Sequence, residues 1–192
     1  MTLQPYIAST EITIQSPSLS QREYELLRDA MPTTRDQLIC KVLRATGRRI
    51  SEVLRCRVSE MVFNGPEVGL YLTRSKKRTE KPVYTLVPLP LGLGTLLRDY
   101  VKGNSLAPDQ SIFGITSRQV ERVFVVASMR ALGRRAHPHE LRGVYATDLI
   151  DGGVPIEAVA HLLGHANPRT TQEYYYRMNA DKIRAIQMRV QV

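Results

Sequence analysis

The sequence predicts a mainly helical domain with a small antiparallel β-sheet, an α+β fold. Apolar residues recur at helical spacing over much of the 192 residues. Between residues 58 and 89 this period gives way to short runs of β-branched and aromatic residues around Asn64-Gly65, a strong hairpin signal. At this length one hydrophobic core suffices for a single domain, and two domains would be crowded.

The first third of the chain predicts an arm followed by helices. Residues 1–19 lack a helical period and are expected to form a loosely held arm. Ser20 and Glu23 have the spacing of a capping box, in which each side chain accepts a hydrogen bond from the backbone N–H of the other residue. Pro32 should stop that helix, and Gly47 should close the next one. A short helix is expected to start at Ile50.

The rest of the chain predicts the sheet and further helices. Strands are expected over residues 58–63, 68–73 and 83–89. Helices are expected from Leu91 to Gly103, from the Thr116 cap to Gly133, from Pro138 to Gly152-Gly153, over 156–163, and as a last pair after Pro168.

The charge balance indicates a polyanionic partner. The chain has 27 Lys and Arg against 18 Asp and Glu, a formal net charge of +9. Charge alone does not separate nucleic acid from an acidic membrane surface. Because the sequence shows neither a membrane-spanning apolar run nor a secretory leader, we expect a cytoplasmic protein without a membrane partner. Cys40 and Cys56 lack CxxC spacing and are expected to be reduced.

Residue types suited to phosphodiester chemistry lie between positions 137 and 177. His139 precedes Arg142 by three residues, His165 ends a Leu-Gly-His run, and Tyr174 follows nine residues later. An arginine can hold two phosphate oxygens, a histidine can donate to phosphate or move a proton, and a tyrosine hydroxyl can attack phosphorus. Singly, each residue has a simpler explanation as an interface histidine, a solvated charge or a helix end. Their joint spacing favours chemistry.

The combination resembles the tyrosine recombinase (phage integrase) family, whose signature is His-x-x-Arg, Leu-Gly-His and Tyr. The family's first catalytic arginine lies in a Thr-Gly-x-Arg-Ile-Ser-Glu motif, here residues 46–52. Arg48 fills a usually apolar position and rivals Arg49 for that role. Glu52 can reach back to hold the guanidinium, although a surface Arg-Glu pair would look the same. The resemblance implies catalytic roles for Arg49, His139, Arg142, His165 and Tyr174.

The basic residues outside this signature leave alternatives. The family's catalytic lysine lies in the second hairpin loop, where Lys76 fits best, although its neighbours Lys77, Arg78 and Lys81 crowd the same loop. Lys77 and Arg78 are expected to contact DNA. A helical set of arginines either follows the phosphate backbone or forms a solvated face; its members are Arg118, Arg122, Arg130, Arg134 and Arg135. We assign DNA contacts to Arg118 and Arg122.

The nucleophile lies in a run of three tyrosines. Successive helical residues point about 100° apart, so only one of Tyr174, Tyr175 and Tyr176 can face a phosphate. The nine-residue spacing from His165 selects Tyr174. Gly143 departs from the family, which often has His at this position.

The resemblance implies a site-specific recombinase catalytic domain that cleaves and rejoins duplex DNA through a 3′-phosphotyrosine. Transesterification of this kind requires no ATP, and we expect no metal or other cofactor. His161 and His165 are four residues apart but lack a further ligand nearby. The implied partners are double-stranded DNA and other recombinase subunits, which form a tetrameric synapse in the family. Alternatives are a type IB topoisomerase-like enzyme and a catalytically inactive DNA-binding or regulatory relative.

The resemblance also divides the chain. It implies a catalytic domain over residues 20–178 and a tail over 179–192, which docks either on a neighbouring subunit or on its own domain. Family members usually carry an N-terminal helical domain, so we expect either an excised catalytic domain or a minimal natural form. The sequence gives neither the DNA site nor the biological setting.

Overall fold

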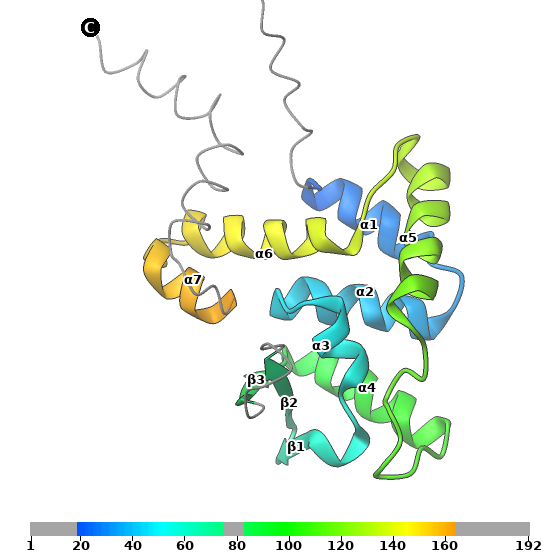
Figure 1. Cartoon of the computed structure of the whole chain (residues 1–192), viewed down its shortest axis with the longest axis vertical. Coiled ribbons are helices and arrows are strands. Elements are labelled where there is room, and N and C mark those ends of the chain that lie inside the picture. Colours follow the sequence, from blue (N-terminus) through cyan, green and yellow to red (C-terminus); the bar gives the residue numbers. More distant parts are fainter. Residues whose placement is uncertain (1–18, 75–82, 164–192) are drawn as a thin grey trace, which may run out of the picture.

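The computed structural model describes residues 19–74 and 83–163, which form a helical domain with a three-stranded sheet at one edge (Figure 1). The predicted fold class is confirmed. The helices are α1 (Gln21–Asp29), α2 (Thr34–Thr46), α3 (Ile50–Arg55), α4 (Leu91–Gly103), α5 (Ser117–Leu132), α6 (Pro138–Asp151) and α7 (Ile156–Leu163). The strands are β1 (Met61–Asn64), β2 (Glu67–Arg74) and β3 (Val83–Pro88), preceded by the 3-10 turn η1 (Val58–Glu60).

The helix ends follow the local capping signals. Ser20 and Glu23 form the predicted capping box at α1, and Thr116 with Gln119 forms another at α5. Gly47 closes α2 in the left-handed conformation, with φ 61°. These boundaries are confirmed because each depends on side chains within one turn of the helix end.

The strand predicted to begin at residue 58 begins only at Met61. Val58–Glu60 instead form η1, whose Glu60 carboxylate accepts a 2.8 Å hydrogen bond from the Arg57 backbone N–H. The Val58 N–H donates to the carbonyl oxygen of Gln110, at 3.0 Å. Because a distant loop satisfies this backbone, residues 58–60 do not pair with a strand.

The sheet is antiparallel in the order β1-β2-β3. Its inner face carries Val68, Leu70 and Leu72, all buried against the helices. Gly94 lets α4 approach β2, since a Cβ there would lie 2.9 Å from Cβ of Val68. The loop between β2 and β3, with Lys76, Lys77 and Arg78, lies outside the described residues.

Helix α6 packs alongside α2 and carries α7 at its far end (Figure 1). Leu141 and Val144 of α6 join the main core, while Ala146 packs with Val159 and Leu163 of α7 in a smaller cluster. This smaller cluster ties α7 to the domain mainly through the C-terminal half of α6.

Within residues 19–74 and 83–163, none of the helices has the length and apolar character needed to span a bilayer.

Gly47 also marks where α6 approaches α2 most tightly. A Cβ there would lie 2.3 Å from Cδ1 of the Tyr145 ring, in addition to the strained backbone. Left-handed backbone costs a non-glycine residue about 1 kcal/mol, and forcing the ring aside costs about 2 kcal/mol more. We expect Gly47→Ala to lower the free energy of unfolding by about 3 kcal/mol in urea denaturation.

Gly65→Ala is the matched control. Gly65 has φ 57°, and a Cβ there would meet nothing within 4 Å. The Gly65→Ala substitution should lower the free energy of unfolding only by the backbone strain, about 1 kcal/mol. Equal losses in the two variants would show that the approach of Tyr145 contributes nothing.

Candidate active site

The site-forming side chains come from the α2–α3 junction and from the first turns of α6. Arg49 is the N-cap of α3, and Glu52 lies in its first turn. His139 and Arg142 lie on α6, which begins at Pro138. The packing of α6 alongside α2 brings these distant segments together (Figure 1).

Glu52 holds the Arg49 guanidinium in the way the sequence suggested. Nη1 of Arg49 lies 3.1 Å from Oε1 of Glu52. The Glu52 side chain is 1% exposed, whereas that of Arg49 is 41% exposed. A buried carboxylate thus fixes a guanidinium that still reaches solvent, so Arg49 can meet an external anion while remaining oriented.

Arg142 is buried and fixed by main-chain carbonyls. Its Nη1 donates to the carbonyl oxygen of Gly47 and its Nη2 to that of Leu163, both at 2.8 Å. These carbonyls lie at the C-terminal ends of α2 and α7, where the helix dipole favours a cation. Burial lowers the pKa of Arg142 to about 10, the nearby Arg49 cation adds to this, and Glu52 opposes it. Arg142 therefore stays charged at neutral pH.

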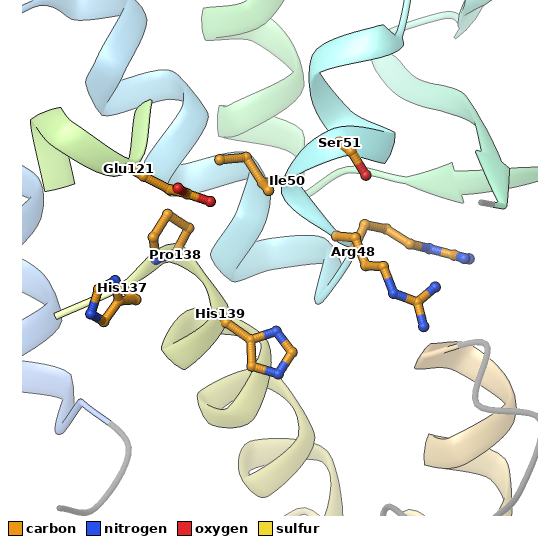
Figure 2. Close-up of a pocket in the computed structure, with 8 residues that line it drawn as sticks. Arg48, Ile50, Ser51, Glu121, His137, Pro138 and His139 are labelled. Carbon is orange, nitrogen blue, oxygen red and sulfur yellow. The ribbon is translucent and has the colours of Figure 1, made fainter. Parts of the chain in front are cut away.

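His139 projects from the start of α6 towards the side of the cavity where Arg48 lies, whereas His137 points away from it (Figure 2). Partial burial lowers the pKa of His139, and the Arg142 and Arg49 cations lower it further. The ring still keeps solvent access. A bound phosphate would offset the two cations, raise the pKa of His139 and favour its protonated, donating form.

A cavity of about 290 Å³ opens between α3 and the start of α6. Its lining consists of Arg48, Arg49, Ile50, Ser51, Glu121, His137, Pro138 and His139. The motifs gave no signal for Glu121, because it reaches the cavity only through the packing of α5. Ser51 belongs to the motif over residues 46–52, although the sequence assigned it no role. Arg48, Arg49 and His139 can together hold an anion there by charge and hydrogen bonding.

Arg48, the rival of Arg49, lines the same cavity but differs in exposure. It is 5% exposed. Its positive charge adds to the lowering of the pKa of Arg142. Burial raises the pKa of Tyr145, and the Arg48 charge offsets part of that increase. Arg48 thus contributes positive potential from within the protein, while Arg49 presents its guanidinium to solvent beside Glu52.

The comparisons with known proteins agree with this arrangement. The model of the phage integrase family matches residues 17–181. The chain belongs to the phage integrase family.

Relatives within the family are tyrosine recombinases. A tyrosine recombinase of Pseudothermotoga lettingae is 32% identical over 167 residues, which cover 84% of this chain and 56% of that protein. Tyrosine recombinase XerA of Thermococcus kodakarensis is 30% identical over 166 residues, covering 82% and 57%. The chain thus spans a little over half the length of these curated relatives.

Solved structures of integrase-family proteins have the same fold. The crystal structure of XerA recombinase matches with a TM-score of 0.70 at 23% identity, over 98% of this chain and 67% of that one. The XerH site-specific recombinase bound to its difH substrate matches with a TM-score of 0.66 at 19% identity, over 87% and 52%. At these identities the likeness establishes the fold.

The two arginines of α5 that were predicted to contact DNA are not among the residues that line the cavity. Arg118 and Arg122 are exposed on α5, and Arg122 borders a separate apolar groove with Val123 and Val126. The side chain of Arg134 is 29% exposed and pairs with Glu23 and Glu140, which lie on α1 and α6. The helical spacing of the arginines gave no signal for these two partners.

Three of the expected catalytic residues, Lys76, His165 and Tyr174, lie outside the described residues. Helix α7 ends at Leu163, two positions before His165. Among residues 19–74 and 83–163, no group of three or more His, Cys, Asp or Glu side chains could hold a metal ion. The described part of the site is therefore a set of cations and a histidine around one cavity.

Proposed function

We propose that this chain is the catalytic domain of a site-specific DNA recombinase, which cleaves and rejoins DNA through a 3′-phosphotyrosine. The observation that carries the proposal is the approach of Arg49, His139 and Arg142 from segments distant in sequence. Arg49 and His139 line one cavity, and Arg142 lies close enough for its charge to lower the pKa of His139. Two guanidiniums and an imidazole this close together suit the trigonal-bipyramidal phosphorane-like transition state, in which the non-bridging oxygens carry extra negative charge. Family membership supports the same conclusion.

The reaction is a pair of transesterifications. The Tyr174 oxygen would attack phosphorus as its phenolic proton leaves to a site base or water, with His139 and His165 handling protons. The bond from phosphorus to the 5′ oxygen breaks, and Lys76 would protonate that oxygen. Arg49 and Arg142 neutralise the developing charge. Because one phosphoester replaces another, a free 5′ hydroxyl can reverse the attack and reseal the strand.

The proposed partners are duplex DNA and further subunits of the same protein. Related structures include a lambda integrase dimer bound to a COC' core site and a lambda integrase tetramer bound to a Holliday junction. The net charge of +9 suits such a polyanion. A DNA substrate implies that the protein acts where DNA is accessible, in the cytoplasm.

The deciding experiment uses a DNA duplex that carries a nick next to the cleavage point. After cleavage a short fragment diffuses away, religation becomes impossible, and the covalent complex is trapped. A recombinase target site of the related proteins serves as the first probe, followed by a random-sequence library. We expect an SDS-resistant protein–DNA adduct. DNA binding without any adduct would indicate the inactive relative. Relaxation of supercoiled plasmid without recombination would indicate the topoisomerase-like enzyme.

DNA affinity should fall steeply with salt. A chain of net charge +9 must depend on phosphate contacts, each of which releases counterions. For about six phosphate contacts, the dissociation constant should rise about a thousandfold between 50 and 200 mM salt. Fluorescence anisotropy with a labelled duplex measures this change. A flat salt response would argue against a DNA partner.

The tail over residues 179–192 is proposed to dock on a neighbouring subunit. Its Ile183, Ile186 and Val190 recur at helical spacing in the sequence and would form a narrow apolar stripe on a helix. Truncation after Asn179 should then reduce assembly on paired sites and strand exchange at least about tenfold, the loss expected from about 1.4 kcal/mol of interface, while sparing single-site cleavage. Gel shifts measure assembly on paired sites, and the adduct assay measures single-site cleavage. Unfolding of the truncated chain would instead assign the tail to its own core.

A further inference from the structure

Arg134 joins helices α1 and α6 through charged side chains. It follows the C-terminus of α5, where Gly133 turns the chain with φ 67°. Its Nε and Nη2 donate to Oε1 of Glu23 on α1, at 3.1 and 3.0 Å. Its Nη1 donates to Oε2 of Glu140 on α6, at 3.2 Å. One guanidinium thus bridges the first turns of α1 and α6.

Both glutamates also cap their own helices. The second carboxylate oxygen of Glu23 accepts the Ser20 N–H at 2.9 Å, and Oε1 of Glu140 accepts the His137 N–H at 2.8 Å. Each carboxylate therefore gives one oxygen to its capping box and the other to Arg134. The arrangement fixes the first turn of α6 relative to α1 through three side chains.

The first turn of α6 is the part of the helix that carries the site. His139 lies between the cap residue His137 and Glu140, and Arg142 follows within the same two turns. A small rotation of this turn would move the His139 ring relative to Arg49 across the cavity. A displacement of about 1 Å at a catalytic group can reduce a rate a hundredfold.

The environment of the bridge favours its charged form. Burial lowers the pKa of Arg134, but hydrogen bonds to Glu140 and Glu23 outweigh this and raise it. The three side chains are between 25% and 31% exposed, so solvent screens each pair in part. The bridge should therefore contribute more to the orientation of α6 than to the free energy of unfolding.

We propose that Arg134 is a positioning residue for DNA cleavage, which aligns the first turn of α6 with α1 and so sets the placement of His139 and Arg142 against the scissile phosphate. This inference rests on the proposed recombinase function. It requires no contact between Arg134 and DNA.

The test compares variants of the full chain in the adduct assay. Arg134→Gln removes the bridge, and Arg134→Lys restores a cation. Glu140→Gln removes the charge of one partner while keeping its capping box, because Gln also suits this position. Rates are measured at saturating DNA, dissociation constants separately, and the adduct amplitude gives the active fraction.

We expect Arg134→Gln and Glu140→Gln to slow adduct formation about tenfold or more, with the dissociation constant for DNA within about twofold of wild type. Arg134→Lys should recover part of the rate. The double variant, Arg134→Gln with Glu140→Gln, should be no slower than the slower of the two single variants, because each single substitution already removes the same bridge. A merely structural role would lower the amplitude without changing the rate of the active fraction.

Arg28→Gln and Glu25→Gln are the matched controls. Arg28 has a side chain 30% exposed, against 29% for Arg134, and it pairs with Asp29 rather than with α6. Glu25 lies on α1 near Glu23 and accepts a hydrogen bond from Gln21. Both controls should cleave at the wild-type rate. A rate for Arg134→Gln equal to that of Arg28→Gln would overturn the inference, whereas a wild-type chain without any adduct would instead overturn the proposed function.

Discussion

The Tyr174→Phe variant should form no covalent adduct with nicked DNA. Removing the hydroxyl leaves no atom to attack phosphorus, and loss of a nucleophile reduces turnover by about 10⁴-fold or more. DNA affinity should stay within about twofold of wild type, because a single neutral hydroxyl contributes little beside the phosphate contacts of a chain with net charge +9. Denaturing gels of the trapped complex and anisotropy on an intact duplex measure the two quantities.

The neighbouring tyrosines provide the control. Tyr175→Phe and Tyr176→Phe should each retain the adduct, since neighbouring residues of the helix predicted there would not face the same phosphate. Peptide mapping of the wild-type adduct identifies the modified residue directly. An adduct formed by the Tyr174→Phe chain would show that the nine-residue spacing from His165 selects the wrong tyrosine.

Replacing Arg142 with Lys should slow cleavage by about 10²- to 10³-fold while changing DNA affinity much less. The lysine ammonium keeps the charge but lacks the planar fork that spans the carbonyls of Gly47 and Leu163, so it cannot present donors in the same plane. Thermal melting by circular dichroism shows whether the variant remains folded at the assay temperature. Cleavage at the wild-type rate in a folded variant would exclude Arg142 from transition-state stabilisation.

The two upstream arginines give an internal comparison. Arg49→Lys should slow cleavage to a similar extent, because Glu52 then holds a point charge in place of a fork. Arg48→Lys should have a smaller effect on the rate, since Arg48 is buried and acts through its charge, which the lysine retains. The opposite order in folded variants would move the catalytic assignment from Arg49 to Arg48.

The sequence predicted those parts of the fold whose signals are local. The capping boxes at Ser20 and Thr116 and the left-handed glycine at position 47 act within one helical turn, so residue type and spacing are sufficient. The predicted start of β1 at residue 58 was wrong because the Val58 backbone N–H donates a hydrogen bond to the carbonyl oxygen of Gln110, far along the chain. No local pattern encodes that contact.

The candidate site divides in the same way. The Arg49–Glu52 pair spans three residues and was foreseen from the helical period. Arg142, in contrast, donates to Gly47 across 95 residues, and Arg134 to Glu23 across 111. Such pairings depend on how α6 packs against α2 and how α5 lies beside α1, which are properties of the tertiary packing. The motifs therefore identified candidate side chains, and the tertiary packing determined which hydrogen-bond partners those side chains have.

The carbonyl bonds of Arg142 have a further consequence for the thermodynamics of DNA binding. A guanidinium has five N–H donors, and in the described part of the chain the Gly47 and Leu163 carbonyls occupy two of them. These two bonds leave the Nε–H and one N–H on each Nη uncommitted to the two carbonyls. An arginine side chain holds about 2 kcal/mol of rotamer entropy. Because the fold has already immobilised Arg142, that entropy is lost before DNA arrives and does not weaken the complex.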